Sequence, residues 1–264
     1  MNLTETLNSI RKTDNGHHQT QIGQDWTQGR TLFGGLQTAL ATHALQQKVP
    51  DDAPLRALQV TFVAPLPADE PITLTTGLLR EGRSALHGEG RLLTASGETA
   101  CVVMAVFGRP RSSVLRFASA APEVDEKETL DVPYLPKRMP SFLQHFNTRW
   151  ARDCLPYSGA AAPVTRVWMA HRDPNPLTIS HLVALADVIP TPAMSTLKAP
   201  AMASSMTWSL DVLDASLDFA PDALWRIDAV ATDAADGYIS QTATLFNPAG
   251  RAAAHARQTV TVFA

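Results

Sequence analysis

Apolar and polar positions along the chain predict two helices, each followed by a series of β-strands. Apolar residues at helical spacing predict the first helix over residues 36–47. Residues 178–190 predict a second helix, in which residues 182–189 are apolar on every side except at Asp187, so this helix is expected to be buried. The strand-length segments cover residues 58–63, 72–81, 84–94 and 99–108 in the first half, and residues 203–213, 224–233, 237–246 and 252–263 in the second half.

One helix followed by a four-stranded meander thus occurs twice, which is typical of an internal repeat. Val106-Phe107 and Val262-Phe263 stand at matching places near the ends of the two halves. We interpret the chain as two copies of one α+β unit, each a long helix packed on an antiparallel sheet. The N-terminal unit is expected over residues 1–109 and the C-terminal unit, which carries the candidate site, over residues 146–264. Prolines and an acidic patch in residues 110–145 predict an extended linker between them.

Asp187 is the one charged residue in the core of the second predicted helix. Aspartate is a poor helix former, and an isolated buried carboxylate is costly unless it is hydrogen-bonded or protonated. Such a residue is typical of a cleft in which the carboxylate takes part in chemistry. In the alternative interpretation, Pro190 and Pro192 end the helix early and Asp187 is a solvated turn residue.

Gln258 is a second candidate, on the last predicted strand. Alternation places Gln258 on one face with apolar neighbours such as Ala256 and Val260. An amide on an apolar face needs partners, because leaving it unpaired costs about 1–3 kcal/mol. A carboxylate on the packed helix would be a suitable partner. The alternative is a glutamine whose amide is satisfied by backbone groups at a strand end.

Composition narrows the range of functions. The chain has 264 residues, 45% of them hydrophobic, which is sufficient for one large or two ordinary domains. A net charge of −3 gives no reason to expect nucleic acid or an anionic membrane as a partner. No segment is apolar for long enough to be a signal peptide or a membrane span. Cys101 and Cys154 are too few and too distant for a metal or redox motif, so we expect a cytoplasmic protein with free thiols, no metal and no cofactor.

Four segments, in this order and spacing, carry a family resemblance. Arg30-Thr31-Leu32-Phe33-Gly34-Gly35 precedes the first helix, and Leu79-Arg80-Glu81-Gly82-Arg83-Ser84 forms a predicted hairpin. Arg166-Val167-Trp168-Met169 opens the second half, and residues 182–187 lie in the second helix. Together they resemble the TesB-like acyl-CoA thioesterases, from about residue 28 to the C-terminus outside the linker. The resemblance implies a double hotdog, in which two tandem helix-on-sheet units share a continuous antiparallel sheet.

The resemblance also implies a catalytic trio. In the family, an aspartate on the second helix, a threonine on the next strand and a glutamine on the last strand activate a water molecule. By position these roles fall on Asp187, Ser205 and Gln258, where the serine departs from threonine but keeps the hydroxyl. Alternation favours Ser205 or Thr207 over Ser204 for the hydroxyl role, because Ser205 and Thr207 share a face of the strand.

Substrate binding is predicted at Gly34, Gly35, Thr207 and Arg83. Glycines at a helix start leave backbone N–H groups open at the positive end of the helix dipole, where they can polarise a thioester carbonyl. At the site in the second half, the N–H groups of residues 179–181 are the expected donors. Arg83 is a candidate for contacts with the phosphates of CoA, and plain solvated charge is its alternative.

The resemblance implies hydrolysis of acyl-CoA to a free fatty acid and CoA, with a homodimer of double hotdogs as the assembly. A hotdog acyl-CoA hydratase is a second hypothesis, and it requires a His/Asp pair. His181 and Asp187 stand on nearly opposite sides of a helix, which argues against it. A third hypothesis is a non-catalytic acyl-binding protein with a degenerate site, which the serine at position 205 leaves open.

Overall fold

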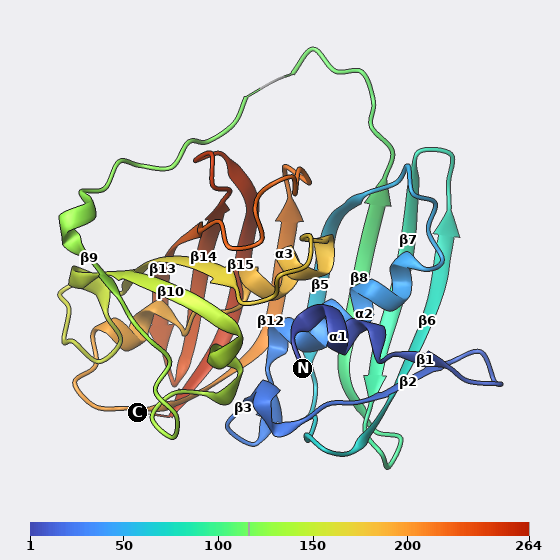
Figure 1. Ribbon diagram of the computed structural model, residues 1–264, viewed down its shortest axis with the longest axis horizontal. Coiled ribbons are helices and arrows are strands. Elements are labelled where there is room, and N and C mark those ends of the chain that lie inside the picture. Colours follow the sequence, from blue (N-terminus) through green and yellow to red (C-terminus); the bar gives the residue numbers. More distant parts are fainter. Residues whose placement is uncertain (116, 264) are drawn as a thin grey trace.

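The computed structural model describes residues 1–115 and 117–263, in which one large antiparallel sheet curves around two central helices (Figure 1). The first half comprises α1 (Leu3–Asn8), β1 (Arg11–Lys12), β2 (His18–Gln21), β3 (Thr27–Gln28), β4 (Thr31–Leu32), α2 (Gly34–Gln46), β5 (Leu55–Phe62), β6 (Pro71–Glu81), β7 (Ala85–Leu93) and β8 (Thr99–Gly108). The second half comprises β9 (Thr129–Asp131), β10 (Phe146–Ala151), β11 (Val164–His171), α3 (Ile179–Ala186), β12 (Met202–Val212), β13 (Trp225–Ala235), β14 (Tyr238–Phe246) and β15 (Ala252–Phe263).

The large sheet is continuous across both halves. Its strands pair in the order β1-β2-β6-β7-β8-β5-β12-β15-β14-β13-β11-β10-β9. β5 and β12 join the halves at the centre, where Trp208 lies opposite Val60. The α+β prediction of two helix-on-sheet units that share a sheet is therefore confirmed.

The predicted meander is wrong in one respect. In each half, the first strand after the helix pairs with the last strand, so that β5 lies beside β8 and β12 beside β15. Alternation along a strand indicates which of its faces is buried, but not which neighbour the strand selects. The same order in both halves nevertheless preserves the repeat.

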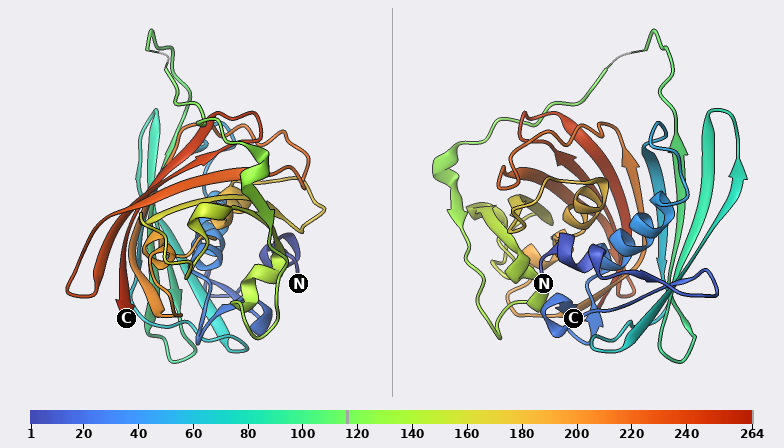
Figure 2. Two further views of the ribbon diagram at one scale, coloured as in Figure 1. Left: turned by 90° about the vertical axis from the view of Figure 1, so that its left-hand side faces the viewer. Right: turned by 45° about the vertical axis from the view of Figure 1, so that its right-hand side comes forward.

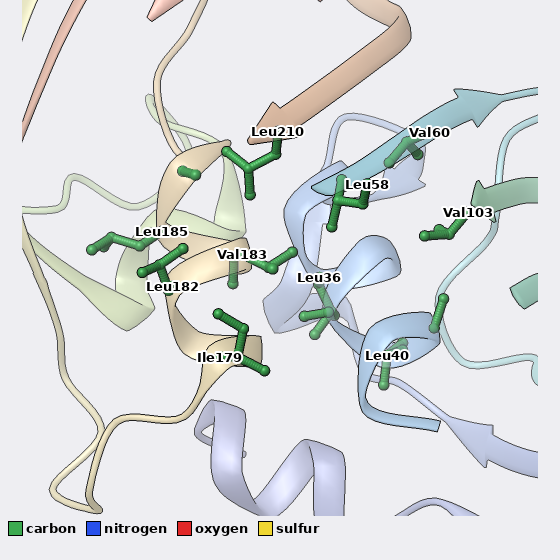
Figure 3. Close-up of a cluster of buried hydrophobic side chains, with 14 of the residues drawn as sticks. Leu36, Leu40, Leu58, Val60, Val103, Ile179, Leu182, Val183, Leu185 and Leu210 are labelled. Atoms are coloured by element: carbon green, nitrogen blue, oxygen red, sulfur yellow. The ribbon is translucent and has the colours of Figure 1, made fainter. Parts of the chain in front are cut away.

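The two central helices lie side by side on the concave face of the sheet (Figure 2). Figure 3 shows Leu36 of α2 facing Val183 of α3, and both side chains are fully buried. A Cβ on Gly35 would lie 2.8 Å from the backbone oxygen of Ala184, so the start of α2 touches the end of α3. No helix in the described ranges is long and apolar enough to cross a membrane.

The second helix is shorter than the sequence predicted. α3 ends at Ala186, and Asp187 follows as its C-cap with φ −109° and ψ 2°. Pro190 gives the physical reason, because in a continued helix its ring would clash with the carbonyl group of Ala186. The early helix end that we considered as an alternative is thus correct. Asp187 is not solvated, however, since only 9% of it is exposed.

The segment predicted to be a linker contributes to the second half. Thr129–Asp131 form β9, which pairs with β10 at the sheet edge, and Ser141–His145 form a short 3₁₀ helix. Phe142 is buried at 2% exposure, stacked on Phe33 with ring centroids 4.0 Å apart. Prolines therefore interrupt the periodic pattern of this segment without preventing it from packing. The domain boundaries at residues 109 and 145 remain a prediction.

Candidate active site

Asp187 lies where the two halves of the molecule meet. It caps the end of α3, and the peptide N–H of Gly35, at the start of α2, donates to its carboxylate. A Cβ on Gly34 would lie 2.8 Å from the Oδ2 atom of Asp187. Because only glycine leaves room at this point, the N-terminus of α2 can approach the carboxylate closely. The structure thus brings Gly34 and Gly35 to Asp187.

Gln258 completes the surroundings of the carboxylate. It is 8% exposed on β15, and its Nε2 atom donates a hydrogen bond to the Oδ1 atom of Asp187. The expectation that this amide meets a carboxylate on the packed helix is correct, and the alternative of backbone partners alone is wrong. Asp187 and Gln258 therefore form one buried polar unit.

Gln241 is a third member of this unit that the sequence reasoning missed. It lies on β14 directly opposite Gln258, and its Nε2 atom donates to the Oε1 atom of Gln258 over 2.7 Å. Since that oxygen is occupied by a donor, the Nε2 atom of Gln258 must point toward Asp187. The missed signal is the same as for Gln258, because Gln241 alternates with buried apolar residues such as Ile239 and Leu245.

Burial governs the ionisation of Asp187. Desolvation raises the pKa of Asp187 to about 7, while the hydrogen bonds from Gln258 and from the Gly35 N–H act in the opposite direction. Burial also raises the pKa of the nearby Cys101 thiol to about 12, and the charge of Asp187 adds to that effect. At neutral pH the aspartate is therefore poised to exchange a proton, whereas the thiol stays protonated and is a poor nucleophile.

A β-bulge decides which hydroxyl on β12 faces the site. The register against β15 shifts between Ser205 and Thr207, so that Ser205 lies opposite Val260 and Thr207 opposite Thr259. Directly paired residues share a face, which places Ser205 on the buried face with Gln258. Thr207 is exposed on the outer face. The structure therefore does not bring Thr207 to Asp187 and Gln258, and its role in substrate binding stays a prediction. The simple alternation that grouped Thr207 with Ser205 fails at the bulge.

Two further predicted contributions do not lie at this site. The N–H groups of residues 179–181 are at the opposite end of α3 from Asp187, so the donors near the carboxylate come from α2 instead. Arg83 is exposed in the hairpin that lies beside Gly108, at one end of β8. Cys101, which is near Asp187, lies toward the other end of β8, roughly 24 Å from Gly108 along the strand. The structure does not bring Arg83 to Asp187.

Solved structures place this architecture in a known class. A protein of unknown function with a hot dog fold from Alicyclobacillus acidocaldarius is similar over 100% of this chain and 99% of its own, with a TM-score of 0.88 at 22% identity. The acyl-CoA thioesterase II TesB2 from Mycobacterium marinum gives 0.77 at 19% identity, over 99% and 98% of the chains. The dehydratase domain of RzxB from Pseudomonas fluorescens gives 0.60 at 12% identity, over 100% of both. The fold is a double hotdog.

Family models narrow this class. The N-terminal domain of the acyl-CoA thioesterases matches residues 22–108, and their C-terminal domain matches residues 118–262. The chain belongs to the acyl-CoA thioesterase family, which confirms the resemblance. No curated protein sequence matches it.

Proposed function

We propose that the protein hydrolyses acyl-CoA thioesters to a free acid and CoA, with Asp187 as the general base. One observation carries this proposal. A buried carboxylate, held by Gln258, lies beside the N-terminus of α2, whose backbone N–H groups are the candidate donors to a substrate carbonyl. Membership of the acyl-CoA thioesterase family supports the choice of substrate.

In the proposed reaction, Asp187 takes a proton from a water molecule while the water oxygen attacks the thioester carbon. The tetrahedral intermediate then expels the CoA thiolate, which takes a proton from the carboxyl group of Asp187 or from solvent. Gln258 and Ser205 hold the water, and Gln241 fixes the amide orientation of Gln258.

Backbone donors at the start of α2 stabilise the negative oxygen of the intermediate. Gly35 already donates its N–H to Asp187, so the N–H of Gly34 is the candidate donor for the substrate oxygen. The missing side chain at Gly34 leaves the backbone open toward the carboxylate. This arrangement combines donors from the first half with a base from the second.

Release of free thiol from acyl-CoAs of graded chain length tests the proposal. Asp187→Asn keeps the shape of the side chain but removes the base, and we expect thiol release to be abolished. Asp211→Asn is the matched control, because Asp211 is exposed on the neighbouring strand β12 and should leave the rate unchanged. An Asp187→Asn variant that keeps more than about a tenth of the parental kcat, a barrier change below roughly 1.4 kcal/mol, would exclude this mechanism.

His181 does not pair with Asp187, which is the His/Asp pair considered for the hydratase hypothesis. Its Nε2 atom lies 3.3 Å from Asp173, and its Nδ1 atom lies 2.9 Å from the hydroxyl of Thr178. Both ring nitrogens are thus engaged at the start of α3, away from Asp187 at the end of that helix. We expect no hydration of enoyl-CoA, measured by loss of the conjugated thioester absorbance. Binding of acyl-CoA without any thiol release would instead support the non-catalytic hypothesis.

A further inference from the structure

A basic cleft lies on the first half, between α1, the β1–β2 hairpin and the end of α2. Its volume is about 640 Å³. Lys12, His18, His43 and Lys48 supply its basic and imidazole groups, and none of its lining residues is acidic. Leu7 and Ala44 give it a buried apolar floor. The cleft is therefore large enough for a small molecule and positively charged at its rim.

The positive charge of this cleft is not neutralised by the protein. In the described ranges, neither Lys12 nor Lys48 has a carboxylate within ion-pair distance. Burial lowers the pKa of His18, and the charges of Lys48, Lys12 and His17 lower it further. Burial and the charge of His18 likewise lower the pKa of His43. The ammonium groups of Lys12 and Lys48 line one cleft in a chain whose net charge is −3, so this local positive charge is not a consequence of the overall composition.

His18 lines the cleft from β2. Its Nδ1 atom is buried and lacks a hydrogen-bond partner among the described residues. Lys12 lies directly opposite His18 in the β1–β2 pairing, so the two side chains share one face of the hairpin. No cluster of metal-ligating side chains occurs in the described ranges, so an anion suits this set of groups better than a metal ion does.

We propose that this cleft binds the phosphate groups of a small anionic ligand, with Lys12 and Lys48 as charge partners and His18 and His43 as hydrogen-bonding groups. Ammonium groups bind phosphate as point charges, and imidazole nitrogens add directed hydrogen bonds. The 13 residues of α2 separate the cleft from Asp187 by about 20 Å, so the proposal does not rest on the proposed function. The phosphates can belong to the nucleotide half of CoA or to a separate ligand.

Isothermal titration of the full-length protein with inorganic pyrophosphate and with adenosine 3′,5′-bisphosphate tests the proposal without any hydrolysis. We expect Lys12→Gln/Lys48→Gln to weaken binding of at least one probe by roughly tenfold or more. Lys127→Gln/Lys137→Gln is the matched control, because it removes two exposed charges remote from the cleft and should change binding less than about twofold. Absence of binding to the parent protein, or equal losses in both double variants, would overturn the proposal.

Steady-state kinetics with acyl-CoA then distinguish the two phosphate sources. If the nucleotide half of CoA occupies the cleft, Lys12→Gln/Lys48→Gln should raise KM with little change in kcat. If a separate phosphate ligand occupies it, pyrophosphate binding is lost while KM for acyl-CoA is unchanged. Because binding and turnover are measured separately, failure of the thioesterase proposal leaves the titration result interpretable.

Discussion

Asp187 should determine the pH dependence of the proposed reaction. Only its carboxylate form can take a proton from water, and burial raises its pKa to about 7. We therefore expect kcat to rise as pH increases through about 7 and to level off above it. A profile of kcat for thiol release between about pH 5 and pH 9 measures this. A rate that stays constant down to about pH 4, near the ordinary aspartate pKa, would mean that Asp187 is solvated or not the base.

The same shift predicts an effect of Asp187 on stability. Its pKa is raised from 3.8 to about 7 by folding, so the folded state holds this proton more tightly than the unfolded state does. Stability should therefore fall as pH rises from about 4 to about 7, where the buried group ionises. We expect Asp187→Asn to exceed the parent in free energy of unfolding by up to about 4 kcal/mol at pH 8, and to match it near pH 3. Urea unfolding at both pH values measures this, with Asp211→Asn as the control.

Gln258 and Gln241 should act as one unit. We expect Gln258→Ala to lower kcat by roughly 10²-fold while the protein stays folded, as for the loss of one preorganised hydrogen bond. Gln241→Met should lower kcat less, because the Gln258 amide can then rotate and present its oxygen to Asp187. If Gln241 acts only through Gln258, the double variant should be no slower than Gln258→Ala alone. Additive losses in kcat would show that Gln241 has a separate role.

At the residue scale, the polar groups of this site can be predicted because they contradict their surroundings. Asp187 and Gln258 are both recognised as polar members of apolar faces, and the structure joins them. Gln241 carries the same signal on β14 and was recognisable by the same argument. What a single sequence does not contain is which of these polar residues face one another.

Gly35 is required by helix packing at the element scale. A Cβ at this position would overlap the ring of Phe33 and would lie 2.8 Å from the backbone oxygen of Ala184. Replacing glycine by alanine within a helix normally stabilises it by about 1 kcal/mol. A loss of stability in Gly35→Ala would therefore indicate the close contact and not helix propensity. We expect Gly35→Ala to lower the free energy of unfolding by about 1–3 kcal/mol, as overpacking does, and to lower kcat. Gly77→Ala, where a Cβ meets nothing within 4 Å, is the control for urea unfolding.

A helix or strand is predictable from the sequence when the pattern that determines it lies within its own segment. The last predicted strand, residues 252–263, coincides with β15 because alternation is a property of the segment itself. The end of α3 is predicted only as the alternative, although Pro190 marks it, because the apolar pattern continues beyond Ala186. The bulge in β12 between Ser205 and Thr207 depends on pairing with β15, so alternation within β12 alone places these two residues on the same face, although they lie on opposite faces.

At the scale of the whole molecule, the candidate site belongs to neither half alone. Gly34 and Gly35 come from the first half, whereas Asp187 and Gln258 come from the second. The repeat in the sequence led us to expect that each half supplies its own helix start, and therefore to choose residues 179–181. The side-by-side packing of α2 and α3 brings the start of α2 to the end of α3 instead. The helix start beside Asp187 therefore comes from the other half because of tertiary packing, which no local sequence pattern specifies.

This shared architecture predicts that the first half does not persist alone as a soluble monomer. Residues 1–115 without the second half would expose the edge of β5 that pairs with β12, together with the apolar side of α2 that Val183 covers. An uncovered strand edge beside an apolar surface favours pairing with a second copy or aggregation. We expect sedimentation of this fragment to show dimers or larger species, and no thiol release, because it lacks Asp187. A stable, monomeric fragment with cooperative unfolding would show instead that the first half is an independent domain.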